Sequence, residues 1–386
     1  MRPQSRRSHQ RAATLTIFFS HALLFASWAA HIPAVKAHLG LSDAALGTIL
    51  LCTPVGSVCA MAVISRLLPK LGSPRMVRIC LVGYCAAGPL VGLAADPLAL
   101  AGALFAWGAF QGALDVSMNT QAVAVEKVQM RPLMPTFHGA WSIGALSGAA
   151  LGAVAVAAHI ALAPQLLILA VPVLTAAAVL SPSMVDDQPT KLPHEPRRGL
   201  WRNRTVLILG AIALATMLCE GAAADWSAVY LHSSAHVTGA LAGLGYTTFA
   251  LTMAGVRLTG TYVLRRHRPE RLLAALALIA SIGMTAALAS GSGTLGLAGF
   301  ACLGAGTALV VPTVFSAAGR LPGLPPGVGI ATVSALGWVG FVCGPPLIGQ
   351  LASITGLRTA LVVIPALALL VAAVIARTPS LAVHET

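Results

Sequence analysis

The chain has 386 residues, of which 57% are hydrophobic and only 9% are charged, and its mean hydropathy is +0.84. A soluble domain carries about 25% charged residues, so this composition excludes an ordinary soluble protein and places most of the chain within a bilayer. The net charge of +13 suggests nucleic acid only if the basic residues form one patch. They are spread over short connections between apolar segments, so we expect no nucleic-acid partner.

Twelve apolar segments are long enough to cross a bilayer. A transmembrane helix needs about 20 mostly apolar residues, and a backbone in lipid must satisfy its own hydrogen bonds, which segments of this length do as helices. The predicted spans are 14–34, 44–66, 76–95, 98–125, 133–157, 160–180, 205–231, 239–263, 272–290, 293–318, 327–352 and 359–376. The first resembles a signal peptide, but its apolar run has the length of a full span, so we expect it to remain as the first helix.

The longest polar stretch, 181–204, separates the first six predicted spans from the last six. We expect a cytoplasmic linker here, between an N-terminal bundle, 1–180, and a C-terminal bundle, 205–386. Nearly all of the 24 Lys and Arg residues fall on one side of the predicted membrane. The exceptions are Lys36, Arg257 and Arg358. Because basic residues accumulate in cytoplasmic connections, we expect both termini in the cytoplasm.

The two halves show signs of an internal repeat. Trp28 and Trp226 are 198 positions apart, and so are Gly47 and Gly245. Two parallel six-helix halves related by an axis along the membrane normal are typical of one large class of transporters, in which the solute binds near the middle of the membrane.

A motif in the fourth span, Gly112-Ala-Leu-Asp115-Val-Ser-Met-Asn119, resembles that of fucose permease-related bacterial transporters, where a carboxylate and an asparagine occupy these positions. Further matching stretches are 28–33, 137–142 and 220–231. The chain thus resembles the major facilitator superfamily over essentially its whole length. This resemblance implies an all-α membrane protein with twelve transmembrane helices in two pseudo-symmetric six-helix bundles. It also implies a secondary transporter of the bacterial inner membrane that works as a monomer.

Two features depart from the usual patterns of that superfamily. The connection between the second and third spans has Ser65 and Pro69 where a glycine and an aspartate are usual, which weakens any account of this loop as a conformational latch. The fifth span has Ala149 where drug/proton antiporters have a proline, which counts against drug efflux.

Polar side chains recur on one face of the fourth span. Gln111, Asp115 and Asn119 are four residues apart, so they share one face of a helix. An ionisable group in an apolar span is costly unless it faces the bundle interior or a wet cavity. We therefore predict that Asp115 couples transport to protons, the alternative being a carboxylate fixed by a structural hydrogen bond. Gln111 and Asn119 are candidate substrate-binding residues or helix-packing contacts.

Three further candidates lie in the first half. His138, early in the fifth span, could titrate near neutrality and take part in proton coupling, but a packing role is the slightly favoured alternative. His21 and Trp28 share one face of the first span and are candidate substrate-binding residues. The Trp28 ring could stack on a sugar or anchor the helix at the membrane surface.

The second half has its own polar candidates. Glu220, in the seventh span, is the second candidate for proton coupling. Asp225 and Trp226 follow it near the outer interface and are candidate substrate-binding residues. Arg257, in the eighth span, could pair with a helix terminus or extend its side chain to the membrane surface, and we favour the second alternative.

The seven cysteines lie in apolar segments without metal-ligand spacing, so we expect no metal and no cofactor. Because the sequence contains no nucleophile, zinc or phosphate-loop motif, we expect no enzymatic activity. The prediction is a secondary active transporter of a small polar solute, with a sugar favoured, in symport with protons through Asp115. One alternative is a proton-driven exporter of drugs or metabolites on the same fold. A second is a non-transporting membrane sensor, for which Asp115→Asn would leave every solute flux unchanged.

Overall fold

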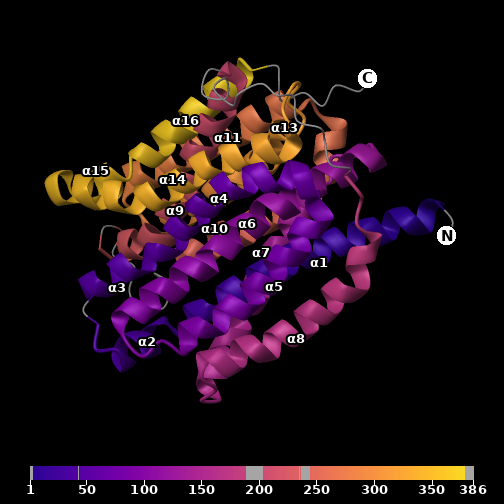
Figure 1. Cartoon of the computed structure of the whole chain (residues 1–386). Coiled ribbons are helices and arrows are strands. Elements are labelled where there is room, and N and C mark those ends of the chain that lie inside the picture. Colours follow the sequence, from indigo (N-terminus) through magenta and orange to yellow (C-terminus); the bar gives the residue numbers. More distant parts are fainter. Residues whose placement is uncertain (1–2, 42, 188–202, 234, 236–243, 379–386) are drawn as a thin grey trace. The chain divides into compact units, whose positions relative to one another are not determined.

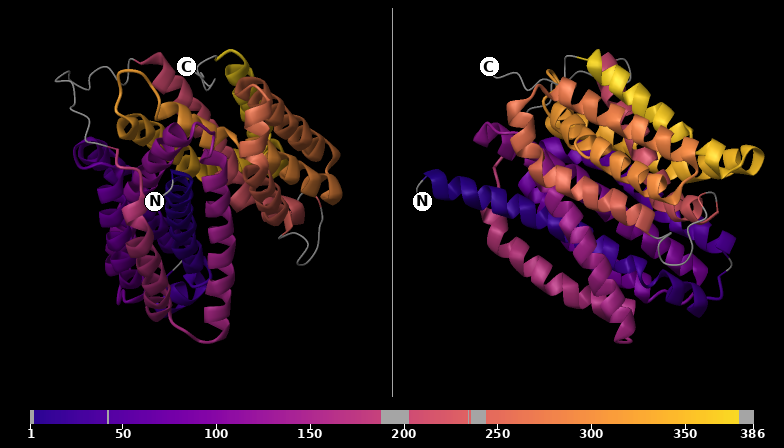
Figure 2. Two further views of the ribbon diagram at one scale, coloured as in Figure 1. Left: turned by 90° about the vertical axis from the view of Figure 1, so that its right-hand side faces the viewer. Right: turned by 180° about the vertical axis from the view of Figure 1, so that it is seen from behind.

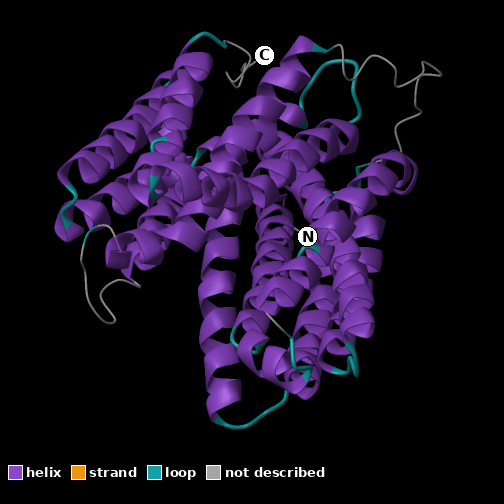
Figure 3. Ribbon diagram, turned by 90° about the vertical axis from the view of Figure 1, so that its left-hand side faces the viewer, coloured by secondary structure: helices purple, strands orange, loops and turns teal. Residues whose placement is uncertain are grey.

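The computed structural model of the chain describes residues 3–41, 43–187, 203–233, 235 and 244–378. This part of the chain is helical and contains no β-strand, as Figure 3 shows. The helices, most of them labelled in Figure 1, begin with α1 (Pro3–Ala29), α2 (Ile32–His38), α3 (Asp43–Leu50), α4 (Cys52–Leu71), α5 (Ser73–Gly92), α6 (Pro97–Gln129), α7 (Met134–Ala157) and α8 (Leu162–Leu180). They continue with α9 (Arg204–Ser233), α10 (Leu244–Arg266), α11 (Pro269–Ser290), α12 (Gly293–Thr307), α13 (Val310–Ala318), α14 (Pro326–Thr355), α15 (Leu357–Ala360) and α16 (Val363–Ala376).

Eleven helical segments in the described part of the chain are long and apolar enough to cross a membrane. The remaining predicted span, 239–263, corresponds to α10, which has 23 residues and so is about 34 Å long at roughly 1.5 Å per residue. Its sequence is less apolar because it includes Arg257 and several threonines. The predicted all-α membrane architecture is confirmed.

Both boundaries of the first helix differ from the prediction for identifiable reasons. The first helix begins at Pro3 rather than at residue 14, because arginine and the other residues of the basic N-terminus are compatible with a helix. It ends at Ala29, four residues before Pro33. A proline cannot continue a helix without losing the hydrogen bond to the residue four before it and clashing with that carbonyl.

The chain divides into two compact units. Unit 1 comprises Met1–Glu195 and Gly319–Thr332, and unit 2 comprises Pro196–Ala318 and Val333–Thr386. The segment Gly319–Thr332, which includes the start of α14, therefore packs with unit 1. Most of the predicted linker, 188–202, lies outside the described residues, so the predicted division into bundles 1–180 and 205–386 stays a prediction.

Close helix contacts in unit 1 depend on glycine. Three glycines of α7 each face a backbone carbonyl of α1: Gly144 faces Phe19, Gly148 faces Leu23 and Gly152 faces Ser27. A Cβ at any of these positions would lie 2.2–2.4 Å from the carbonyl oxygen, so only glycine permits this approach. Gly108 and Gly112 of α6 meet α4 in the same way. α8 packs beside α1 and α5 (Figure 2).

Unit 2 has a core of apolar side chains that includes Phe249, Met284 and Phe300. Phe300 and Tyr230 pack edge to face, with ring centroids 6.3 Å apart. The Tyr230 hydroxyl donates to the carbonyl of Ala287 over 3.0 Å, which ties α9 to α11. Gly340 of α14 faces the carbonyl of Leu214 on α9, the same kind of contact that joins α1 and α7 in unit 1.

Candidate functional site

The polar face predicted on the fourth span lies on α6 in unit 1. Gln111 and Asn119 are fully buried, and Asp115 between them is partly buried. Asp96 is the N-cap of α6, and its carboxylate accepts a hydrogen bond from the backbone N–H of Ala99 over 2.8 Å. The four-residue spacing therefore places the three polar side chains on one face of α6, where Gln111 and Asn119 are buried and Asp115 is half-buried.

Asp115, Asn119 and His138 form one hydrogen-bonded group. Asn119 Nδ2 donates to the backbone carbonyl of Asp115 over 2.8 Å and to its Oδ1 over 3.2 Å. Asn119 Oδ1 lies 3.2 Å from His138 Nε2 on α7. Because Nδ2 is used for Asp115, Oδ1 must accept, and His138 therefore donates through Nε2–H. The structure thus brings together three of the predicted site residues.

A second polar group lies around His21 of α1. Trp141 Nε1 donates to His21 Nδ1 over 3.0 Å. The His21 ring stacks on Tyr84 of α5 with centroids 5.5 Å apart, and Tyr84 stacks on Trp107 of α6 at 5.3 Å. This group joins four helices of unit 1. Trp28, two turns along α1, is also buried.

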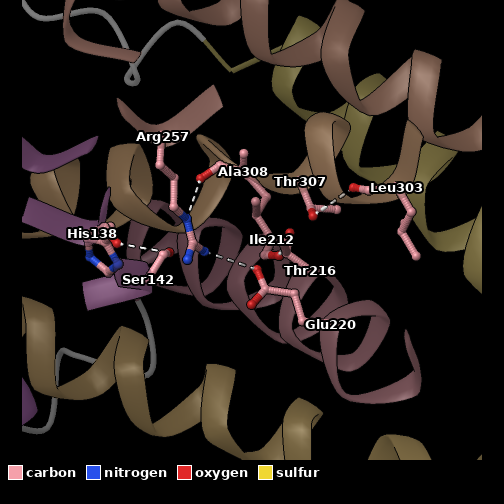
Figure 4. Close-up of polar contacts among 9 residues, drawn as sticks. All are labelled: His138, Ser142, Ile212, Thr216, Glu220, Arg257, Leu303, Thr307 and Ala308. Atoms are coloured by element: carbon pink, nitrogen blue, oxygen red, sulfur yellow. Dashed lines mark hydrogen bonds and ion pairs between the residues drawn. The ribbon is translucent and has the colours of Figure 1, made fainter. Parts of the chain in front are cut away.

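In unit 2 the predicted candidate Glu220 on α9 pairs with Arg257 on α10 (Figure 4). Arg257 Nη2 lies 3.7 Å from Glu220 Oε1, and Arg257 Nε donates to the carbonyl of Ala308 over 3.1 Å. Arg257 is only 4% exposed. Our favoured interpretation of Arg257, a side chain that extends to the membrane surface, is therefore wrong. The other alternative, a contact with a helix terminus, is what the structure shows.

The helix terminus in question is the end of α12. The predicted tenth span, 293–318, is broken between α12 and α13 at Ala308 and Leu309. Pro312 lies four residues beyond Ala308 and has no N–H to offer to that carbonyl. The Arg257 guanidinium supplies the missing donor, and a cation at a helix C-terminus is also favoured by the helix dipole.

The two other predicted residues of unit 2 lie apart from this pair. Asp225, five residues after Glu220 on α9, is exposed. Trp226 is partly buried against the core of unit 2, where its ring would meet a Cβ placed on Gly349. Its indole N–H is buried without a hydrogen-bond partner. Among the residues that the structure describes, no group of three or more His, Cys, Asp or Glu side chains could hold a metal ion.

Glu126 is a buried carboxylate that sequence reasoning missed. α6 runs four residues beyond the predicted end at 125, so Glu126 lies inside the helix and is only 2% exposed. Its Oε1 accepts from the backbone N–H of Met134 over 2.8 Å, and its Oε2 accepts from Arg320 over 2.7 Å. Glu126 follows Asn119 by seven residues, so the spacing on the polar face could have pointed to it.

Another carboxylate, that of Asp187, lies where α5 begins. Asp187 Oδ1 accepts from the backbone N–H of Ser73 over 2.8 Å, and the amide of Gln121 on α6 bridges Ser73 and Val185. Burial raises the pKa of the Asp187 carboxyl, against the lowering effect of the hydrogen bonds from Ser73. These contacts fasten the segment after α8 to the start of α5.

Known proteins share both this sequence pattern and this fold. The profile of the Major Facilitator Superfamily matches residues 14–328. An uncharacterised MFS-type transporter of Yersinia pestis is 34% identical over 364 residues, 94% of each chain. The membrane protein MosC of Rhizobium meliloti is 35% identical over 356 residues, 92% of this chain and 86% of that protein.

Solved transporters have the same fold at low sequence identity. The MFS transporter FucP in its outward conformation superposes with a TM-score of 0.79 and 18% identity, covering 95% of this chain and 97% of that one. The human organic anion transporter MFSD10 superposes with a TM-score of 0.78 and 14% identity, covering 97% of this chain and 100% of that one. With the profile match and the relatives above 30% identity, these findings establish that the chain is a multi-pass membrane transporter of the major facilitator superfamily.

Proposed function

We propose that this protein is a proton-coupled secondary transporter that moves a small polar solute, with a sugar favoured, by alternating access across the bacterial inner membrane. The observation that supports the proposal is the hydrogen-bonded group of Asp115, Asn119 and His138 on α6 and α7, within predicted membrane spans. An ionisable side chain inside a membrane bundle usually marks an ion or substrate pathway.

In this proposal Asp115 carries the coupling proton. As a carboxylate it accepts the hydrogen bond from Asn119 Nδ2. After it takes up a proton, Asn119 can keep its shorter hydrogen bond to the Asp115 backbone carbonyl, so the local structure tolerates both charge states. His138 holds the amide of Asn119 from the other side and is a second group that could exchange a proton.

The pair of Glu220 and Arg257 is the proposed counterpart in unit 2. A buried ion pair adds little to stability compared with an apolar pair, so stability alone does not explain why Glu220 and Arg257 are paired here. Protonation of Glu220 would remove the negative charge beside Arg257, whose Nε still donates to the carbonyl of Ala308. We propose Glu220 as the second residue of the coupling machinery.

Several finer statements belong to the same proposal. We propose that Gln111, Asn119, His21, Trp28, Asp225 and Trp226 contribute to solute binding. The excess of basic residues in one set of connections supports cytoplasmic termini and a cytoplasmic linker at 181–204. The description of FucP as a fucose:proton symporter supports a neutral, hydroxyl-bearing solute and proton symport. The description of MFSD10 as an organic anion transporter is instead compatible with the alternative of a metabolite exporter.

The test separates coupling from binding. Purified protein in proteoliposomes is assayed for solute-exchange counterflow and for accumulation driven by an imposed proton gradient, with fucose and a panel of neutral sugars and polyols. We expect Asp115→Asn to lose proton-driven accumulation and to retain counterflow. The matched control is Asp96→Asn, which removes an exposed carboxylate while keeping a good helix cap. Proton-driven accumulation by Asp115→Asn at the wild-type level would refute the role of Asp115.

A further inference from the structure

Four arginines lie within seven residues where α10 ends and α11 begins. They are Arg265, Arg266, Arg268 and Arg271. All four are exposed, and none of them forms an ion pair with an acidic side chain in the part of the chain that the structure describes. Glu270 is the one acid in these seven residues, so four positive charges against one negative charge leave a net charge of +3. An exposed charge of this density, without partners, indicates a ligand of opposite sign.

The arginines continue two exposed apolar stripes of unit 2. On α10, Leu258 and Tyr262 are exposed and lie on the same helix face as Arg266. On α11, Leu278 is exposed and follows Arg271 by seven residues, which again places both on one face. Exposed apolar side chains of membrane helices contact the lipid chains, and tyrosine and arginine at the helix ends lie at the level of the headgroups. The arginines therefore adjoin a lipid-facing surface.

α12 lies between α10 and α11. Gly304 of α12 faces the backbone carbonyl of Phe249 on α10, where a Cβ would lie 2.1 Å from the oxygen. Gly306 faces the carbonyl of Leu276 on α11 in the same way, at 2.5 Å. Residues two apart on a helix point in nearly opposite directions, so α10 and α11 pack on opposite sides of α12. These close contacts hold α10 and α11, whose ends carry the arginines, in one layer.

Arg266 is held by Tyr262, one turn earlier on α10. The guanidinium carbon of Arg266 lies 4.1 Å from the centre of the Tyr262 ring. A cation over an aromatic face is stabilised by the ring. Because the N–H groups of a stacked guanidinium lie at its edge, it can still donate two of them to one phosphate group. Tyr262 is thus a positioning residue for Arg266.

Helix stability does not explain the arginines at the start of α11. Arg268 is the N-cap residue, and its side chain makes no capping hydrogen bond. Arg271 lies in the first turn, where the positive end of the helix dipole disfavours a cation. Glu270 in the same turn offsets only part of this charge. A negatively charged group beside these arginines would make the local electrostatics favourable.

We propose that an arginine surface, made of Tyr262, Arg266, Arg268 and Arg271, binds the phosphate group of an anionic phospholipid whose acyl chains lie along the apolar stripes of α10 and α11. Charge is the first reason for this occupant, because clusters of about four to eight basic residues beside a membrane helix attract anionic lipids. The second reason is that a lipid uses both the arginines and the apolar stripes, whereas a soluble phosphate uses only the arginines. This site goes beyond the proposed transport function and does not depend on it.

The test measures the binding of single lipids to the purified full-length protein in neutral detergent by native mass spectrometry. Phosphatidylglycerol is compared with phosphatidylcholine that has the same acyl chains, and glycerol phosphate is added as a competitor without chains. The test variant is Arg266→Gln/Arg271→Gln. The matched control is Arg204→Gln/Arg377→Gln, which removes the same charge from two exposed arginines of unit 2 at the ends of α9 and α16. Tyr262→Leu and Tyr262→Phe test the positioning of Arg266 without removing a charge.

We expect the wild type to bind phosphatidylglycerol at least about tenfold more tightly than phosphatidylcholine. The test variant should lose about fivefold in affinity for phosphatidylglycerol for each arginine, about 25-fold together, and the control should keep the wild-type affinity. Tyr262→Leu should weaken binding by about two- to fivefold, whereas Tyr262→Phe should not, because phenylalanine keeps the ring face.

Equal affinities of the wild type for the two lipids, or equal losses in the test and control variants, would overturn the proposal. Displacement of phosphatidylglycerol by glycerol phosphate at equal concentration would assign the surface to a soluble phosphate and overturn it too. Equal binding by the two tyrosine variants would overturn the positioning role of Tyr262. The assay involves no transported solute, so a failure of the proposed transport function would leave its result unchanged.

Discussion

Replacing Arg257 by methionine tests the contacts that hold α9, α10 and the broken α12–α13 helix together. The substitution keeps much of the side-chain volume but removes the cation beside Glu220 and the donor to Ala308. Loss of one partner of a buried ion pair costs about 3–5 kcal/mol, and an orphaned buried carbonyl costs about 1–3 kcal/mol. The ion pair is long, at 3.7 Å, and the Glu220 side chain is 17% exposed, so we expect a loss near the lower limit, about 3 kcal/mol.

The same substitution should cost less when Glu220 is already uncharged. In a Glu220→Gln background, Arg257→Met still removes the donor to Ala308 but no longer breaks the ion pair, so we expect a smaller loss of about 1–2 kcal/mol. The double-mutant cycle should therefore show a coupling of about 1–2 kcal/mol. The free energy of unfolding is measured by reversible denaturation in mixed micelles, followed by tryptophan fluorescence. Arg265→Met, which removes an exposed arginine at the end of the same helix, is the control.

Two results would refute this reasoning. If Arg257→Met and Arg265→Met changed the free energy of unfolding equally, Arg257 would not be the buried partner that the structure shows. If the Arg257→Met effect were the same with Glu220 or glutamine at position 220, the carboxylate and the guanidinium would not be coupled.

Three further predictions concern unit 1. Gly148→Ala should lower the free energy of unfolding by about 1–3 kcal/mol, because the added methyl group overpacks the contact with α1. The control is Gly102→Ala, where a Cβ meets nothing within 4 Å, and it should raise the free energy of unfolding by up to about 1 kcal/mol. Equal effects of the two variants in a denaturation assay would contradict the close helix contact. Because burial raises the folded-state pKa of Asp187 above 3.8, wild-type stability should fall as pH rises from about that value through the folded pKa and then level off. Asp187→Asn should lack this dependence, and parallel pH profiles of the unfolding temperature would contradict it. Arg320→Met should destabilise by about 1–3 kcal/mol, because Glu126 stays buried while Arg320 is partly exposed, and Arg320→Lys should restore part of the loss.

The contacts within one helix were the part of the site that sequence could predict. Asp115 and Asn119 are four residues apart, so a helix brings their side chains together whatever surrounds it. The partner of Asn119 on the other side, His138, depends on how α7 packs against α6. That packing depends on tertiary contacts that the spacing of residues within one helix does not specify.

The errors have physical causes of the same kind. Arg257 lies in a predicted apolar span, and its partner Glu220 is on the preceding helix, α9, so its pairing depends on how α9 and α10 pack. Pro312 cannot donate a hydrogen bond to the carbonyl of Ala308, four residues earlier. The sequence indicates this unpaired carbonyl, but only the structure shows that Arg257 is its donor. Glu126 was missed because hydropathy marks the end of the apolar run, whereas α6 continues as a helix to Gln129.

The most direct test of the central claim is a count of protons. Purified wild-type protein and Asp115→Asn are mixed with saturating solute in weakly buffered detergent solution, and the protons taken up or released are measured with a pH indicator. A coupling carboxylate changes its protonation when solute binds, so we predict a proton change in the wild type that Asp115→Asn lacks, although the variant still binds the solute. An equal proton change in both proteins would contradict the assignment of Asp115 as the proton carrier.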